Sequence, residues 1–315
     1  MTWLDAYPAP PSIESQLAAM TQPRPPALAQ HFPDTHMRNF SSLELARFSF
    51  DTRCKQLQPP ADMQVERVNL NGVSAMWAIP EDYVGSRTLV YVHGGGFVLG
   101  SAEAFVGLAG NLALQAGARA LILDYRLAPE HPFPSAREDI LAAYHALLGN
   151  GIAAEEIVFA GDSSGANLIL SLLEDAKCQC LPLPAAALLI SPWVDLSLQH
   201  ESFTTKAASD ICLTPEWLAN CASLYLGEIS AVDPRVSVLQ NSMIGLPPMM
   251  IQVGSNELLL DDSLRLARHA GGMGVRVRLD VWPNMFHLWH NHASELEEGD
   301  AALLQGAEFL AANLP

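Results

Sequence analysis

Eight short runs of apolar and β-branched residues constrain the fold of this chain more than any other feature. They occupy residues 64–70, 74–80, 88–93, 119–125, 156–161, 186–191, 248–254 and 275–282. From the third run onward most are continuously apolar, as expected of strands that are covered on both faces. Helical patterns separate most of these later runs, at about 101–117, 135–149, 165–176 and 262–272, and another follows at 293–312. This alternation predicts an α/β fold with a mainly parallel eight-stranded sheet and helices on both faces.

Two segments depart from the alternation. Residues 1–60 are rich in Pro, Gln, Ala and Met and contain helix-like pieces without a strand pattern. Residues 196–245 carry one helical pattern, TPEWLANCASLYLG, and no convincing strand. We therefore expect 1–60 and 196–245 to form a helical cap over a core made of residues 61–195 and 246–315. The first two β runs have no helix between them, which predicts an antiparallel hairpin at the sheet edge.

Composition narrows the classes of function. The chain has 315 residues and a net charge of −17, from 17 basic and 34 acidic residues. Such a surface repels nucleic acid and anionic lipid, so neither is an expected partner. The N-terminus lacks the pattern of a secretory signal, and no apolar run approaches the ~20 residues that span a bilayer. Five cysteines form an odd set without zinc spacing, which predicts reduced thiols in a cytoplasmic protein.

The segment EIVFAGDSSGANLILSLL contains a strand, the motif G-x-S-x-G and a helix in succession. A strand-to-helix turn this tight holds its central serine in strained dihedrals and requires small flanking residues. Ser163 is therefore a candidate nucleophile, exposed above the sheet beside the positive end of a helix. The alternative is a small-residue turn without chemistry, which the agreement of strand, motif and helix disfavours.

Three consecutive glycines, Gly94 to Gly96, follow His93 at the end of a buried strand. Glycines lose the most backbone entropy on folding, so a run of three suits a loop whose N–H groups must point at an anion. The spacing fits neither a dinucleotide fingerprint nor a P-loop. We interpret His93 as a structural hydrogen-bonding residue, because it ends the strand before the glycine loop.

The segment FHLWHNH places His287, His290 and His292 after the last strand. A general base for Ser163 is expected in this position, because the order serine, acid, histidine is that of an α/β-hydrolase. The rival interpretation is a metal cluster, but the spacing matches no zinc site and nearby carboxylate or thiolate ligands are lacking. Local pattern alone does not choose among the three histidines.

Taken together, HGGG, DYRLAPEHPFPSARED, GDSSG, SPWVDL and FHLWH resemble the bacterial hormone-sensitive-lipase-like family of α/β-hydrolases over roughly residues 65–312. The resemblance implies an α/β-hydrolase fold with a helical cap, Ser163 as nucleophile and His287 as base, with His290 as a structural neighbour. It also implies an oxyanion hole formed by backbone N–H groups of Gly95, Gly96 and Ser164. Ser164 departs from the family pattern, which usually has alanine there.

The acid of the triad has two candidates. The family pattern of an acid, a leucine two residues later and a second acid four residues later maps onto Glu257, Leu259 and Asp261. Glu257 follows a strand closely, where open α/β sheets place their sites. Asp261 and Asp262 open a helix and are explained as capping residues. We predict Glu257 as the acid, with Asp261 as the alternative.

These residues predict a serine carboxylesterase that needs no cofactor or metal and acts on short- to medium-chain acyl esters through an acyl-enzyme. A lactonase or amidase would use the same machinery. A non-catalytic ligand receptor on the same scaffold is the alternative from another class, although such proteins characteristically lose the base that His287 provides. The resemblance makes a homodimer plausible. Arg126 and Glu130 are predicted to form a buried pair that braces the site.

Overall fold

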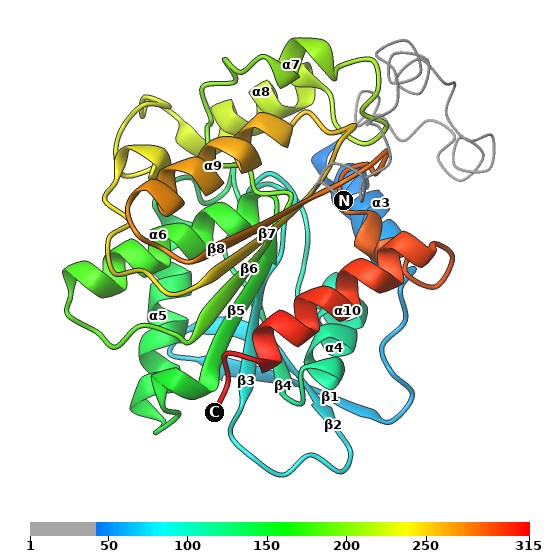
Figure 1. Ribbon diagram of the computed structural model, residues 1–315, viewed down its shortest axis with the longest axis vertical. Helices are drawn as coiled ribbons and strands as arrows, with labels where there is room; N and C mark the ends of the chain where they lie inside the picture. The colour runs from blue at the N-terminus through cyan, green and yellow to red at the C-terminus, as the bar shows by residue number, and fades with distance from the viewer. Residues whose placement is uncertain (1–41) are drawn as a thin grey trace, which may run out of the picture. The chain divides into compact units, whose positions relative to one another are not determined.

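The computed structural model describes residues 42–315, and the part of the predicted cap that falls on residues 1–41 lies outside it. Its centre is a sheet of eight strands in the order β1-β2-β4-β3-β5-β6-β7-β8 (Figure 1). The strands are β1 Met63–Leu70, β2 Val73–Pro80, β3 Thr88–Val92, β4 Arg119–Asp124, β5 Ile157–Asp162, β6 Ala186–Ile190, β7 Met249–Gly254 and β8 Val277–Trp282. The predicted hairpin is confirmed, since β1 pairs antiparallel with β2. β2 pairs antiparallel with β4. All further neighbouring strands, from β4 through β3, β5, β6 and β7 to β8, pair in parallel. The predicted fold class is therefore confirmed.

Helices cover both faces of the sheet. The described helices are α3 Leu43–Cys54, α4 Val106–Gln115, α5 Ser135–Gly149, α6 Ser164–Cys178, α7 Ser202–Thr205, α8 Pro215–Leu226, α9 Leu260–Gly272 and α10 Glu297–Ala311. Helices α4 and α10 pack on one face, whereas α5, α6 and α9 pack on the other (Figure 1). Within residues 42–315, no helix is both long enough and apolar enough to cross a membrane.

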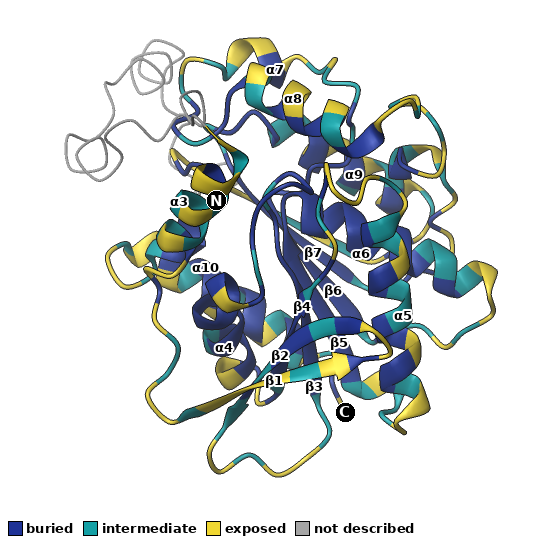
Figure 2. Ribbon diagram, turned by 180° about the vertical axis from the view of Figure 1, so that it is seen from behind, coloured by how far each residue is buried: buried dark blue, intermediate teal, exposed yellow. Residues whose placement is uncertain are grey.

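The pattern of burial explains why the central runs are continuously apolar. Every residue of β3, β5, β6 and β7 is buried, and consecutive side chains alternate between the cores on the two faces. In β3, for example, Val90 belongs to the core that includes residues of α5 and α6, whereas Tyr91 belongs to the core that includes residues of α4. The edge strand β1 is mostly exposed (Figure 2). Strands covered on both faces need apolar residues at every position, and an edge strand does not.

The connection between β6 and β7 is an insertion without strands that spans residues 191–248 and contains α7, α8 and the short 3-10 helix η4, Val238–Gln240. The main helix, α8, starts where the sequence predicts. Thr214 accepts a hydrogen bond from the Trp217 N–H at 3.1 Å, and Pro215 occupies the first helical position. Both are favourable at a helix N-terminus.

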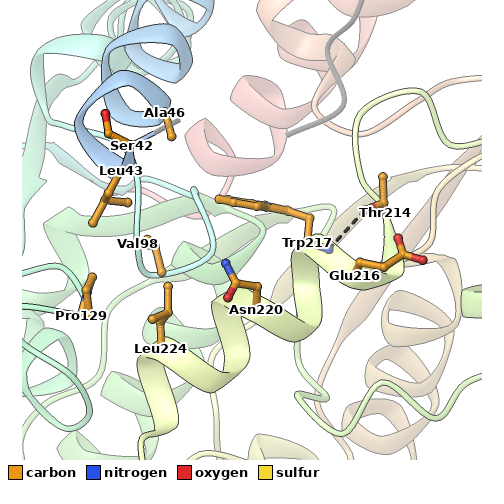
Figure 3. A pocket seen from close by; sticks show the side chains of 10 residues that line it. All are labelled: Ser42, Leu43, Ala46, Val98, Pro129, Thr214, Glu216, Trp217, Asn220 and Leu224. Carbon is orange, nitrogen blue, oxygen red and sulfur yellow. Dashed lines mark hydrogen bonds between the residues drawn. The ribbon is translucent and has the colours of Figure 1, made fainter. Parts of the chain in front are cut away.

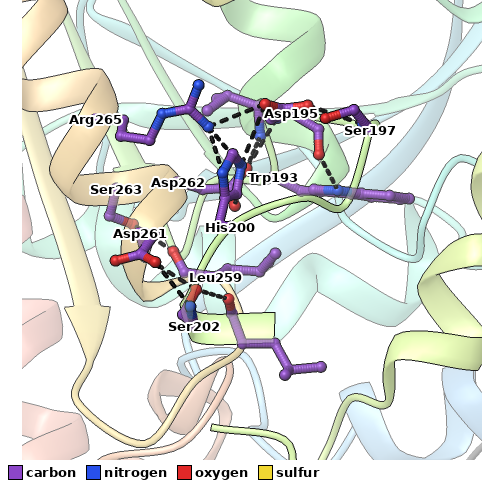
Figure 4. A network of polar contacts seen from close by, with 12 residues as sticks. Trp193, Asp195, Ser197, His200, Ser202, Leu259, Asp261, Asp262, Ser263 and Arg265 are labelled. Carbon is purple, nitrogen blue, oxygen red and sulfur yellow. Dashed lines mark hydrogen bonds and ion pairs between the residues drawn. The ribbon is translucent and has the colours of Figure 1, made fainter. Parts of the chain in front are cut away.

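The expectation that Asp261 and Asp262 cap α9 is wrong. The N-cap residue is Leu259, and both carboxylates instead accept N–H groups of the insertion (Figure 4). Asp262 Oδ1 accepts from the N–H groups of Val194 and Asp195, each at 2.8 Å. Asp261 Oδ2 accepts from the Ser202 N–H at 2.7 Å. These carboxylates therefore anchor the inserted segment to the start of α9.

Asp262 should make stability depend on pH. Its carboxyl group is fully buried, and burial raises its pKa to about 8 against the hydrogen bonds that it accepts. An unfolded chain loses this proton near pH ~3.9, so the native state binds more protons between about pH 4 and pH 8. Stability therefore falls as pH rises through this window.

We expect Asp262→Asn to flatten that slope and to raise the free energy of unfolding at about pH 8 by at least ~1 kcal/mol. Asparagine keeps the Oδ1 acceptor for Val194 and Asp195 but cannot ionise. Urea unfolding followed by tryptophan fluorescence, at a series of pH values, measures the difference. All other carboxylates are common to both proteins, so an unchanged slope would contradict this assignment.

The predicted pair between Arg126 and Glu130 is also wrong. Arg126 Nη2 lies 2.7 Å from Asp139 Oδ1 of α5. Glu130 Oε2 lies 2.7 Å from Arg47 Nη2 of α3. Arg126 and Glu130 are closer to each other in the sequence than either is to the residue with which it forms an ion pair. The residues that they bind, Asp139 and Arg47, belong to helices that approach them only in the folded chain.

Candidate active site

Ser163 sits at the turn between β5 and α6, in the predicted strained conformation, with φ 52° and ψ −119°. The prediction that it is exposed is wrong, because Ser163 is buried in the folded chain. The flanking glycines are needed for close packing. A Cβ on Gly165 would lie 2.0 Å from the carbonyl oxygen of Val92, and one on Gly161 would lie 2.6 Å from the same atom. The serine backbone is held from the adjacent β6 side, because its N–H donates to Ile190 O at 2.9 Å and its carbonyl accepts from the Trp193 N–H at 3.0 Å.

His287 and Glu257 form a hydrogen-bonded pair. His287 Nδ1 lies 2.8 Å from Glu257 Oε2. The Glu257 carboxylate is fully buried, and its other oxygen, Oε1, accepts from Ser191 Oγ at 2.7 Å and from the Gly254 N–H at 2.6 Å. The carboxylate is therefore fixed from two sides, and Oε2 faces the imidazole. Asp261 points to the insertion instead.

Ser163 and the His287–Glu257 pair lie at the carboxyl ends of neighbouring strands. Ser163 follows β5, Ser191 follows the adjacent β6, and Glu257 follows β7. Ser191 links the two parts of the site, because it comes directly after the residue that binds the Ser163 N–H and also binds Glu257. Asp162, the last residue of β5 and the residue before Ser163, is affected by the charge of His287, which lowers its pKa.

The glycine loop is fitted against the turn and against α8. The N–H of Gly94 donates to Asp162 Oδ1 at 2.9 Å, and a Cβ on Gly94 would lie 2.1 Å from Asp162 Oδ2. Gly95 and Gly96 have φ values of 112° and 65°, which favour glycine. A Cβ on Gly96 would lie 2.8 Å from Cys221 Sγ of α8. The loop thus has no room for a side chain at any of its three glycines.

Ser164 and Phe97 add two contacts that the motifs did not reveal. The Ser164 hydroxyl accepts a hydrogen bond from the Phe97 N–H at 3.2 Å, which joins the start of α6 to the end of the glycine loop. The Phe97 ring stacks on Tyr225 of α8, with ring centroids 3.8 Å apart. Ser164 is also the first residue of α6, where backbone N–H groups have no partner within the helix.

The three histidines after β8 have different surroundings. The buried His290 bonds Gln252 Oε1 through Nε2 at 3.0 Å, and its pKa is lowered to about 3 by burial and by the charge of His287. His292 Nδ1 lies 3.9 Å from Glu295. Within the described part of the chain, no group of three His, Cys, Asp or Glu residues is arranged to hold a metal ion. His287 is the histidine of the three that meets the candidate acid.

The electrostatic surroundings favour a protonated His287. Burial disfavours the charged imidazole, but the hydrogen bond to Glu257 and the negative charges of Glu257, Asp210 and Asp162 outweigh burial and raise its pKa. Asp162 itself is buried, and burial raises its pKa to about 6, against hydrogen bonds from Tyr91 and Gly94 and the charge of His287. The site therefore carries negative charge around the imidazole of His287.

Sequence reasoning missed Ser191 and Asp210 in this site. Ser191 lies within the quoted segment SPWVDL, so its place after a strand was a usable signal. Asp210 lies in the insertion, where no pattern marks it. His93, in contrast, forms a structural hydrogen bond as interpreted. It is buried, its Nδ1 lies 2.8 Å from Gly94 O, and its ring stacks on Tyr125.

Comparison with known proteins agrees with this architecture. A family profile described as alpha/beta hydrolase fold matches residues 89–291. An acetyl-hydrolase of Streptomyces hygroscopicus is 39% identical over 279 residues, covering 87% of this chain and 91% of that protein. An esterase of Acinetobacter venetianus is 36% identical over 278 residues, with the same coverage. The crystal structure of an esterase from the bacterial hormone-sensitive lipase family aligns with a TM-score of 0.85 at 36% identity, covering 95% of each chain.

The fold and the site define the class of α/β-hydrolases, in which a turn after a central strand presents the reactive residue. Within that class, the chain belongs to the bacterial hormone-sensitive-lipase-like family, as its motifs implied. It is an enzyme that hydrolyses carboxylic esters.

Proposed function

We propose that this carboxylesterase works through a Ser163-His287-Glu257 triad and an acyl-enzyme. Nδ1 of His287 is hydrogen-bonded to Glu257, so Nε2 is the ring nitrogen available to take the Ser163 proton. The serine oxygen attacks the ester carbonyl, and His287 then protonates the departing alcohol. Water activated by the same imidazole hydrolyses the acyl-enzyme and restores Ser163. No cofactor takes part.

We propose that the oxyanion of each tetrahedral intermediate is bound by N–H groups of Gly95, Gly96 and Ser164. The positive φ values of the two glycines and the position of Ser164 at the start of α6 support this assignment. Such donors stabilise charge that develops in the transition state, and one of them is typically worth about 3 kcal/mol. The contacts of the loop with Asp162 and Cys221 hold the donors in place.

The observation that carries the proposal is the 2.8 Å hydrogen bond between His287 and Glu257, at the strand ends where Ser163 sits in its strained turn. A general base needs a partner that fixes its tautomer and stabilises its charged form, and a fully buried carboxylate does both. This arrangement favours an enzyme over a ligand receptor on the same scaffold.

We propose that α3, α7 and α8 are the described parts of the cap. A cavity of about 680 Å³ lies between α3, α8 and the segment after the glycine loop (Figure 3). Its lining consists of Ser42, Leu43, Ala46, Val98, Pro129, Thr214, Glu216, Trp217, Asn220 and Leu224. The volume suits a small ligand. Trp217 projects from α8 toward the cavity (Figure 3). We propose that its ring limits the space for an acyl chain.

The proposed substrates are therefore small esters with short to medium acyl chains. The similarity to an acetyl-hydrolase supports the short end of this range. All five cysteines lie within residues 42–315 and none of them forms a disulfide there, which supports a cytoplasmic location. The outer edge of β8 ends the sheet, and we propose it as the contact surface of a homodimer.

Rates against p-nitrophenyl acetate, butyrate, octanoate and dodecanoate test this function. We expect kcat/KM to be highest for acetate or butyrate and at least tenfold lower for dodecanoate. Trp217→Ala enlarges the cavity and should shift the preference toward octanoate. Val232→Ala, at an exposed position of the insertion, is the control and should leave the order unchanged. No turnover of any ester would refute the function, and an unchanged order in Trp217→Ala would refute the role of the cavity.

A further inference from the structure

Asp210 is a buried carboxylate in the insertion between α7 and α8, and only 1% of its surface is exposed. It accepts three backbone N–H groups at short distance. Oδ1 accepts from Cys212 and Leu213, and Oδ2 accepts from Leu258, each at 2.8 Å. None of the ion pairs found among residues 42–315 includes Asp210, so backbone dipoles and the electrostatic field of the site compensate its charge.

The contacts of Asp210 lead to both members of the His287–Glu257 pair. Leu258 directly follows Glu257, so the hydrogen bond to its N–H fixes the loop that carries the acid. Cys212, at the turn that Asp210 closes, donates its thiol to the backbone carbonyl of His287 at 3.5 Å. The Asp210 carboxylate thus connects the insertion directly to the loop that carries Glu257. It is connected to His287 indirectly, through Cys212.

The charges near His287 give Asp210 a second effect. The titratable groups that act on this imidazole are Glu257 after β7, Asp162 at the end of β5, Asp210 in the insertion and His290 in the short helix η5, Trp289–His292. Burial raises the pKa of Asp210 to about 6, while the charge of His287 and the N–H groups of Leu213 and Leu258 oppose that rise. Asp210 is therefore largely ionised at neutral pH and attracts a proton to His287.

We propose that Asp210 is a positioning residue for ester hydrolysis: it fixes the Glu257 loop from the insertion and stabilises, as an anion, the imidazolium of His287. This inference rests on the proposed triad. The imidazolium forms each time His287 takes the proton of Ser163 or of water, and a fixed negative charge in a buried site stabilises it without reorganisation. The insertion would thus contribute to the chemical step as well as to substrate selection.

Asp210→Asn tests the charge with little change of shape. Asparagine keeps an acceptor for Cys212 and Leu213 but presents an amide to the Leu258 N–H. With p-nitrophenyl acetate, we expect kcat to fall about tenfold and the acid limb of the kcat/KM profile to move down by about half a pH unit. The direction follows because removal of a negative charge lowers the pKa of His287. A residue that only supported the fold would not move this limb.

Three further variants complete the experiment. Asp210→Ser is a second uncharged variant whose hydroxyl can accept from the same turn, should the asparagine variant not fold. Asp210→Glu keeps the charge, so its acid limb should stay near that of the wild type even if kcat falls. Asp233→Asn changes a partly exposed turn carboxylate of the same insertion and should alter neither quantity.

Labelling with a fluorophosphonate separates the two levels of the proposal. Attachment of the label to Ser163 in the wild type, located by peptide mass spectrometry, supports the triad independently of Asp210. If the wild type is labelled there and the uncharged variants keep the wild-type acid limb, the inference on Asp210 is overturned and the triad stands. If Ser163 is not labelled, the proposed function itself fails.

Discussion

Replacement of Ser163 by alanine should reduce kcat/KM for p-nitrophenyl butyrate by about 10⁵-fold, because the acyl-enzyme can no longer form. The oxyanion donors and the binding cavity remain and sustain only a small residual rate. The measurement is initial-rate kinetics on purified protein, together with loss of fluorophosphonate labelling.

Ser171→Ala is the matched control for this variant. Ser171 is a buried serine two turns further along α6, and its hydroxyl donates a long hydrogen bond of 3.5 Å to Asn167 Oδ1. Its replacement should leave kcat/KM within about twofold of the wild type. Substantial turnover by Ser163→Ala, at a level close to the control, would show that another residue is the nucleophile.

Glu257→Gln should lower kcat by about 10³- to 10⁴-fold with little change in KM. Glutamine has almost the shape of glutamate, but it carries no charge to stabilise the imidazolium. Its amide nitrogen can also face Nδ1 and favour the wrong tautomer of His287. Steady-state kinetics on p-nitrophenyl butyrate, with circular dichroism to check folding, measures the loss.

Asp261→Asn decides between the two acids that the sequence left open. Asp261 accepts the Ser202 N–H of the insertion, whereas Glu257 meets His287 Nδ1. We therefore expect the Asp261 variant to keep at least a tenth of the wild-type kcat. A larger loss of kcat in Asp261→Asn than in Glu257→Gln would reverse the assignment.

The parts of the fold that could be predicted are those governed by local physics. Strands buried on both faces need apolar residues throughout, so their positions and the hairpin of β1 and β2 were visible in the sequence. The conformation of Ser163 also followed from its motif, because two flanking glycines and a strand-to-helix turn leave few alternatives.

The parts that failed depend on partners far away in the chain. Arg126 and Glu130 are four residues apart, but they bind Asp139 and Arg47 because α5 and α3 approach them in the folded protein. Asp262 resembles a capping residue, but its carboxylate reaches N–H groups about seventy residues upstream. Local spacing shows what a side chain could bind, and the tertiary fold decides which partner it meets.

The fit between Gly96 and Cys221 limits how this enzyme could diversify. Because a thiol of α8 fills the space beside Gly96, and Tyr225 of the same helix stacks on Phe97, an exchanged or redesigned insertion would disturb the backbone of the glycine loop. Grafting a helix from a relative should therefore succeed only if a small side chain is retained at position 221 and an aromatic ring at position 225. New substrate preferences are more accessible through point changes on the other side of that helix.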